Sequence, residues 1–152
     1  MRNAIRQWFR VLIGVAALAS ALPAAAEDAR QLVTMPAAAR EIMRQAMIEN
    51  LGTLNGVLGL LAEDRLKEAG ELAESGFGMS SMGRHMDMGS GMRGMGPGRY
   101  MPEGMHNLAM AMHSTGSDFA RAAASGDRAA AMKALQAVTA NCFACHSSYR
   151  TR

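Results

Sequence analysis

The sequence lacks the features on which several common protein classes depend. It has only two cysteines, Cys142 and Cys145, and the histidines His85, His106 and His113 lie elsewhere in the chain, so we do not expect a zinc site built from about four cysteine and histidine ligands. No segment alternates apolar and polar residues with a period of two, so no strand is predicted. It also lacks a glycine-rich phosphate loop, carboxylates paired by a motif and a recognisable nucleophile. We therefore do not expect an enzyme.

The first 26 residues are predicted to be a cleaved export signal. They begin with three arginines and continue with an apolar stretch at 11–22, shorter than the roughly 20 residues that a membrane-spanning helix needs. Small residues at 24–26 then form a cleavage site of the A-x-A kind. Residues 27–152 are expected to be one periplasmic domain with no stable membrane span.

The basic character of the chain comes largely from that signal. The formal net charge is +3, and residues 1–26 contain three arginines and no acid, so removing them takes the charge to 0. The sequence pI of about 9.3 therefore predicts no nucleic-acid partner.

Four segments show helical periodicity and together predict an all-α, antiparallel four-helix bundle. The first helix is expected from Pro36 onward, with apolar residues such as Leu51 and Leu58 toward the core. The second is expected over residues 64–75, ending at Gly76. The third begins near Pro102 and ends near Gly126, and Asp127 is expected to cap the fourth.

The last helix carries the most specific motif of the chain. Residues 142–146 read Cys-Phe-Ala-Cys-His, the C-x-x-C-H pattern of covalent haem attachment. On a helix, positions i, i+3 and i+4 share a face. Both thiols can therefore reach the porphyrin vinyl groups while His146 lies under the iron, which predicts one covalent haem c.

A redox-active dithiol or a structural disulfide fits the cysteine pair less well. A thioredoxin-like redox pair has its first cysteine at a helix N-terminus, whereas this pair lies deep inside the last helix. A disulfide between positions i and i+3 of a helix is geometrically awkward and gives His146 no role.

The C-terminal segment from Cys142 through Tyr149 to Arg150 resembles the end of the class II c-type cytochromes, the cytochrome c prime family. In that family the haem motif lies near the end of a four-helix bundle, followed by an aromatic and a basic residue. The resemblance makes His146 the proximal iron ligand. Arg150 is a candidate partner of a haem propionate, because guanidinium matches carboxylate geometry.

The resemblance places the second axial ligand on the first helix. We predict Met47, with Met43 as an alternative one turn earlier, and a low-spin, six-coordinate iron. A register counted from Arg44 puts Ile48 at this position instead, which would leave the iron five-coordinate.

A Met- and Gly-rich loop is expected between the second and third helices, over residues 76–101. Eight methionines occur from Met79 to Met105, and thioethers are soft ligands that select Cu(I). His85, Met86 and Met88 are therefore candidate copper ligands. Long loops of this kind are usually either functional or disordered.

The leading functional hypothesis is electron transfer with periplasmic redox partner proteins, because a bundle that fixes two axial ligands sets an iron potential. The alternatives are a nitric oxide or small-gas binding protein with an open distal site, and a copper-handling protein that uses the Met-rich loop. The family resemblance also implies that the chain can form a homodimer.

Overall fold

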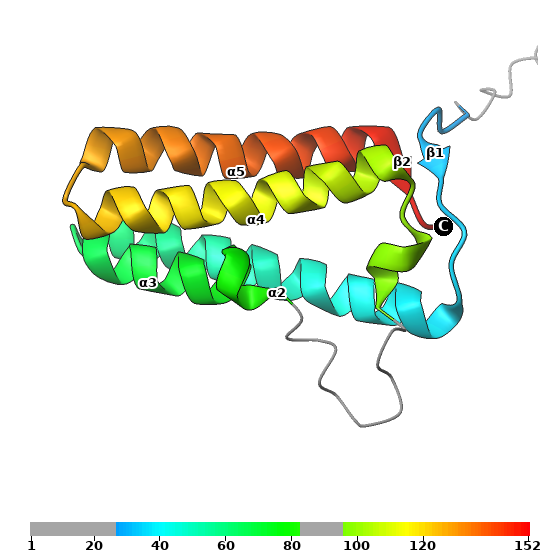
Figure 1. The fold of residues 1–152 in the computed structure, drawn as a ribbon, viewed down its shortest axis with the longest axis horizontal. Helices are drawn as coiled ribbons and strands as arrows, with labels where there is room; N and C mark the ends of the chain where they lie inside the picture. Colours follow the sequence, from blue (N-terminus) through cyan, green and yellow to red (C-terminus); the bar gives the residue numbers. More distant parts are fainter. Residues whose placement is uncertain (1–26, 83–95) are drawn as a thin grey trace, which may run out of the picture.

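The computed structural model describes residues 27–82 and 96–152, and within these ranges the fold is an all-α bundle (Figure 1). The four helices are α2 (Ala37–Ala62), α3 (Leu66–Phe77), α4 (Glu103–Ala124) and α5 (Arg128–Ser148). Short 3₁₀ helices follow α3 and precede α4, at η1 (Met79–Ser81) and η3 (Pro97–Tyr100). The predicted fold class is confirmed.

Two tight turns make consecutive helices antiparallel. Residues 63–65 join α2 to α3, and residues 125–127 join α4 to α5. In the second turn Gly126 adopts φ 76°, a conformation that favours glycine. The carboxylate of Asp127 then accepts a hydrogen bond from the backbone N–H of Ala130 at 2.9 Å, so the predicted cap of α5 is present.

The larger of two apolar clusters fills the part of the bundle that all four helices share. Phe77, Phe119 and Val57 are its largest fully buried side chains. Leu135 and Val138 bring α5 into the same cluster. Burying such side chains contributes roughly 1.5–3 kcal/mol each, so this cluster is the main source of stability for the helix packing.

The predicted end of the second helix is corrected by two residues. Gly76 lies inside α3, which continues to Phe77. A Cβ atom at Gly76 would overlap the side chain of Thr53 on α2. This glycine is therefore needed for close helix packing rather than for a helix stop. The start of the predicted loop is likewise helical, since η1 follows almost at once.

A short parallel strand pair corrects the prediction of a chain without strands. Strand β1 (Gln31–Leu32) pairs with β2 (Tyr149–Arg150), with Gln31 opposite Tyr149 and Leu32 opposite Arg150. The N–H of Val33 extends the pairing by donating to the carbonyl of Arg150 at 2.8 Å. Figure 1 shows this N-terminal segment alongside the end of the chain.

The first and last helices do not close tightly on each other. Neighbouring helices along the chain pack extensively, whereas α2 and α5 make few contacts. Leu51 and Leu58, expected in the core, are 68% and 51% exposed. One long flank of α2 is therefore apolar but uncovered.

Candidate haem-binding site

Cys142, Cys145 and His146 lie on the last two turns of α5. Both cysteines are half-buried, free thiols, whereas His146 is exposed. Cys142 packs against the larger apolar cluster and Cys145 against a second, smaller one. The two thiols thus face inward, as a helix predicts for positions i and i+3.

The environment of the thiols is not that of a redox-active pair. Desolvation raises the pKa of Cys142, and desolvation together with the neighbouring Cys142 raises the pKa of Cys145. Reactive cysteines of dithiol oxidoreductases have lowered pKa values. This favours the sequence-based preference for haem attachment over a thioredoxin-like function.

The second apolar cluster surrounds Cys145 with methionines. Its buried members include Met35, Met43 and Met105, and Met101 packs against them. Met43, the alternative distal ligand, is therefore buried in the same cluster as the second cysteine of the motif. Met35, Met101 and Met105 are thioethers near the motif that the sequence analysis did not consider as iron ligands.

The uncovered flank of α2 is a candidate surface for haem binding. Contacts with α3 occupy one side of α2, through Thr53 and Gly56. At 3.6 residues per turn, Met47, Leu51 and Leu58 lie on the other side. Met47 is 39% exposed there, and Ile48 points further outward at 51% exposed.

The matching flank of α5 carries the axial histidine. Asn141 of α5 donates a hydrogen bond to Oγ1 of Thr115 at 3.4 Å, so that side of α5 faces α4. Helical spacing places His146, Met132 and Phe143 on the opposite side, and Phe143 is 75% exposed. Because the first and last helices close the ring of a four-helix bundle, these flanks of α2 and α5 border one seam, called here the α2–α5 seam.

Arg150, two residues after the end of α5, carries a buried donor that makes no hydrogen bond among the described residues. Its Nε is buried without a hydrogen-bond partner among the described residues, 3.7 Å from a carboxylate oxygen of Asp28. A buried donor of this kind fits an anionic group such as a haem propionate. The free thiols, the exposed imidazole and this donor together form a set of groups that suits haem c.

The N-terminal segment also reaches the motif. Arg30 donates from Nη1 to the carbonyl oxygen of His146 at 3.2 Å, and Asp28 pairs with Arg30 at 2.7 Å. Hydrogen bonds from Arg30 lower the pKa of Asp28 to about 2. Residues 28–33 therefore fasten the end of α5, a contact that no periodic pattern in the chain indicates.

Comparison with known proteins agrees with this geometry. The family model described as Cytochrome C' matches residues 100–150, about one third of the chain. Residues 100–150 are thus similar to the cytochrome c prime family. Searches of curated proteins and of solved structures gave no match. The matched segment contains α4, α5 and the complete C-x-x-C-H motif, and this similarity supports a haem c cofactor.

Two groups of predicted residues lie outside the described part of the chain. The proposed signal at 1–26 is one, and the candidate copper ligands His85, Met86 and Met88 are the other. Within the described ranges no helix is both long and apolar enough to cross a bilayer.

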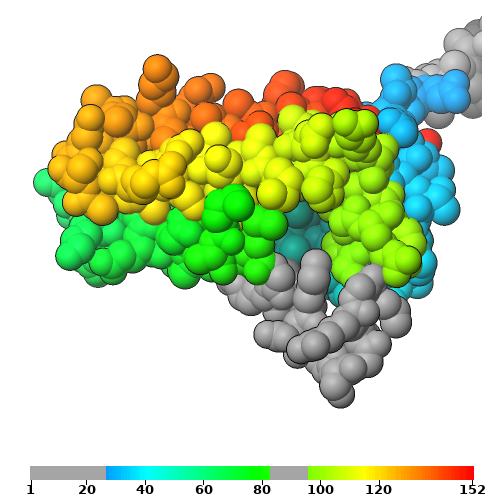
Figure 2. All heavy atoms as spheres, in the orientation of Figure 1, coloured from blue at the N-terminus to red at the C-terminus, as the bar shows by residue number. Residues whose placement is uncertain are grey.

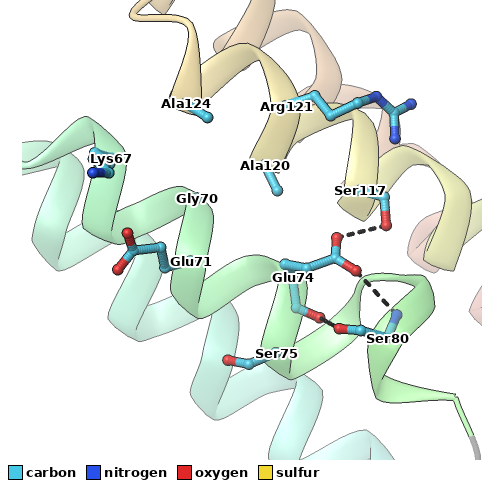
Figure 3. Close-up of a pocket in the computed structure, with 10 residues that line it drawn as sticks. All are labelled: Lys67, Gly70, Glu71, Glu74, Ser75, Ser80, Ser117, Ala120, Arg121 and Ala124. Atoms are coloured by element: carbon cyan, nitrogen blue, oxygen red, sulfur yellow. Dashed lines mark hydrogen bonds between the residues drawn. The ribbon is translucent and has the colours of Figure 1, made fainter.

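A groove of about 580 Å³ lies between α3 and α4, away from the haem motif (Figure 3). Glu74 accepts hydrogen bonds there from Oγ of Ser117 at 2.6 Å and from the N–H of Ser80 at 3.0 Å. Ser80 in turn donates to the carbonyl of Glu74 at 2.9 Å. Since these polar groups satisfy one another, we assign the network a structural role, which is to hold η1 against α3 and α4.

Proposed function

We propose that the chain is a periplasmic mono-haem cytochrome that transfers electrons and is not an enzyme. The main support for this proposal is one helical turn of α5 beside the α2–α5 seam. This turn carries two inward-facing thiols and an exposed imidazole. Members of the cytochrome c prime family are typically periplasmic, which agrees with the proposed export signal.

In this proposal Cys142 and Cys145 hold the haem covalently, and His146 binds the iron. Haem c in the seam would supply a one-electron iron couple. The apolar clusters of the bundle exclude water from the side of the porphyrin that they border, and Arg30 orients the end of α5 through the carbonyl of His146. Arg150 offers its buried Nε to a propionate.

We further propose that Met47 completes the iron coordination. Its place on the seam flank supports this assignment, because the thioether is close to the surface that a haem would cover. Met43 has separate support in its burial beside Cys145. Ligation by a methionine thioether raises the reduction potential, which suits an electron carrier.

Gas binding is the second candidate function, and it requires a distal site that is vacant or held by a displaceable ligand. Ile48 at the distal position would favour it, whereas ligation by Met47 would oppose it. Copper handling by His85, Met86 and Met88 stays a prediction from composition.

Homodimer formation is supported by Ile48 on the outward side of α2, which leaves apolar area for a partner.

The test is an optical spectrum of the purified holoprotein together with extraction in acidified acetone. Covalent haem should stay with the wild-type protein and should be extracted from a Cys142→Ala, Cys145→Ala variant. Narrow low-spin bands in the reduced form would support methionine ligation and electron transfer. A high-spin spectrum that changes with nitric oxide would support the gas-binding alternative, and haem that extracts from the wild-type protein would contradict covalent attachment.

A further inference from the structure

A histidine outside the haem site has the surroundings of a metal ligand. Nδ1 of His113 lies 3.0 Å from the carbonyl oxygen of Phe77 and 3.3 Å from that of Gly78. It also lies 3.4 Å from Oγ of Ser81. Carbonyl oxygens only accept hydrogen bonds, so Nδ1 must carry the proton. The neutral ring then keeps its lone pair on Nε2.

A hydrogen bond from Nδ1–H to a backbone carbonyl is common in histidines that bind a metal through Nε2. Histidines that bind metals almost always donate the other ring N–H to a carbonyl or a carboxylate, which fixes both tautomer and ring orientation. His113 is half-buried on the α3-facing side of α4. Its position is therefore set by the end of α3, and Nε2 is the nitrogen available to an ion.

Two exposed thioethers lie at the same junction. The N–H of Met79 donates to Oγ of Ser117 at 2.9 Å, one helical turn beyond His113 on α4. Met82 directly follows Ser81, which contacts His113. Met79 and Met82 are 44% and 42% exposed, although large apolar side chains are usually buried.

We propose that His113, Met79 and Met82 bind one Cu(I) ion at the junction of η1 and α4. The ligand set is one imidazole nitrogen and two thioether sulfurs, all neutral. Thioethers select soft Cu(I), whereas hard cations such as Mg²⁺ and Ca²⁺ require oxygen ligands. The site is independent of the haem function and of the loop residues His85, Met86 and Met88.

The backbone that carries the thioethers is held in place before any ion binds. The carboxylate of Glu74 receives hydrogen bonds from Ser117 and Ser80, one from α4 and one from η1 (Figure 3). Ser81 closes the turn by donating to the carbonyl of Gly78 at 2.7 Å. In Figure 2 the η1 region, coloured green, borders a hollow in the molecular surface. An ion would therefore meet a fixed turn at an accessible edge.

The experiment is an anaerobic titration of the full-length holoprotein with Cu(I) in competition with a chromogenic chelator, bathocuproine disulfonate. The variant His113→Asn keeps an N–H donor near the position of Nδ1 and removes Nε2. We expect it to weaken Cu(I) binding at least tenfold, and the double variant Met79→Leu, Met82→Leu to do the same. X-ray absorption of the loaded wild-type protein should show both sulfur and nitrogen neighbours of copper.

Matched controls separate this site from other methionines and histidines. His106→Asn removes an exposed histidine elsewhere on α4. It should leave the Kd within twofold. A further variant replaces Met86, Met88, Met92 and Met95 with leucine and should still bind one Cu(I). The proposal is overturned if the wild-type protein does not bind Cu(I), or if binding survives in His113→Asn and disappears in the leucine variant.

Discussion

Met43 of α2 and Cys145 of α5 pack in one apolar cluster, although α2 and α5 otherwise make few contacts. Met47, one turn further along α2, lies at the exposed edge of the α2–α5 seam instead. The two candidate axial ligands thus differ in burial. This difference makes them separable by substitution.

The first prediction concerns the iron coordination. Met47→Leu should convert the reduced holoprotein from a low-spin to a high-spin spectrum, because leucine offers no ligand atom. Met43→Leu conserves volume in the core and should leave the spin state unchanged, at a stability cost below about 1.5 kcal/mol. Absorption spectra of both variants show which methionine binds the iron. A high-spin spectrum for Met43→Leu and a low-spin spectrum for Met47→Leu would assign the ligand to Met43.

The second prediction concerns Arg150. If Arg150 pairs with a haem propionate as proposed, replacing it with methionine removes a positive charge from the haem edge, and a nearby cation favours the reduced, less positive iron. The reduction potential of Arg150→Met should therefore fall by an amount on the order of tens of millivolts. Spectroelectrochemical titration measures it. Arg152→Met, at the exposed end of the chain, is the matched control. Equal reduction potentials for the two variants would show that Arg150 does not contact the haem.

The third prediction concerns the packing of α2 on α3. Gly76→Ala should destabilise the protein by about 1–3 kcal/mol, despite the better helix propensity of alanine, because its Cβ would overlap Thr53. Gly59→Ala is the control, since nothing lies within 4 Å of a Cβ there. It should stabilise the helix by about 0.5–1 kcal/mol. Urea unfolding of both variants compares them, and equal midpoints would contradict the close contact.

The fourth prediction concerns pH. The hydrogen bond from Ser117, followed by those from Ser80, lowers the pKa of Glu74 from its ordinary value of 4.5. A carboxylate with a lowered folded-state pKa stabilises the fold above the unfolded-state value, and this contribution disappears as the pH falls through the folded-state pKa.

Glu74→Gln should therefore be less stable than the wild-type protein at pH 7, by roughly 1 kcal/mol. The gap should narrow as the pH falls below the ordinary carboxyl pKa of 4.5 and should close once the pH has passed the lowered folded-state pKa of Glu74. Thermal unfolding at pH 7 and pH 3 tests this expectation, with Glu71→Gln on the exposed side of α3 as the control. A gap that stays the same at both pH values would show that the charge of Glu74 is not involved.

Much of the fold followed from local patterns in the sequence. The four helices, the cap at Asp127 and the inward placement of Cys142 and Cys145 all depend on residues close together in the chain. Local rules failed where a long-range contact decided the outcome. Gly76 resembled a helix stop, but its role depends on Thr53, which belongs to another helix.

The sequence by itself determined the helical class and the haem motif, because helical periodicity and the spacing of C-x-x-C-H act within a few turns of one helix. Only the tertiary structure decided which flanks of α2 and α5 stay uncovered, and it also brought residues 28–33 onto the end of α5. It likewise brought His113 of α4 into contact with Ser81 of η1. The physical reason is that helix packing and two-residue strand pairing join residues far apart in the chain, and no periodic pattern records such contacts.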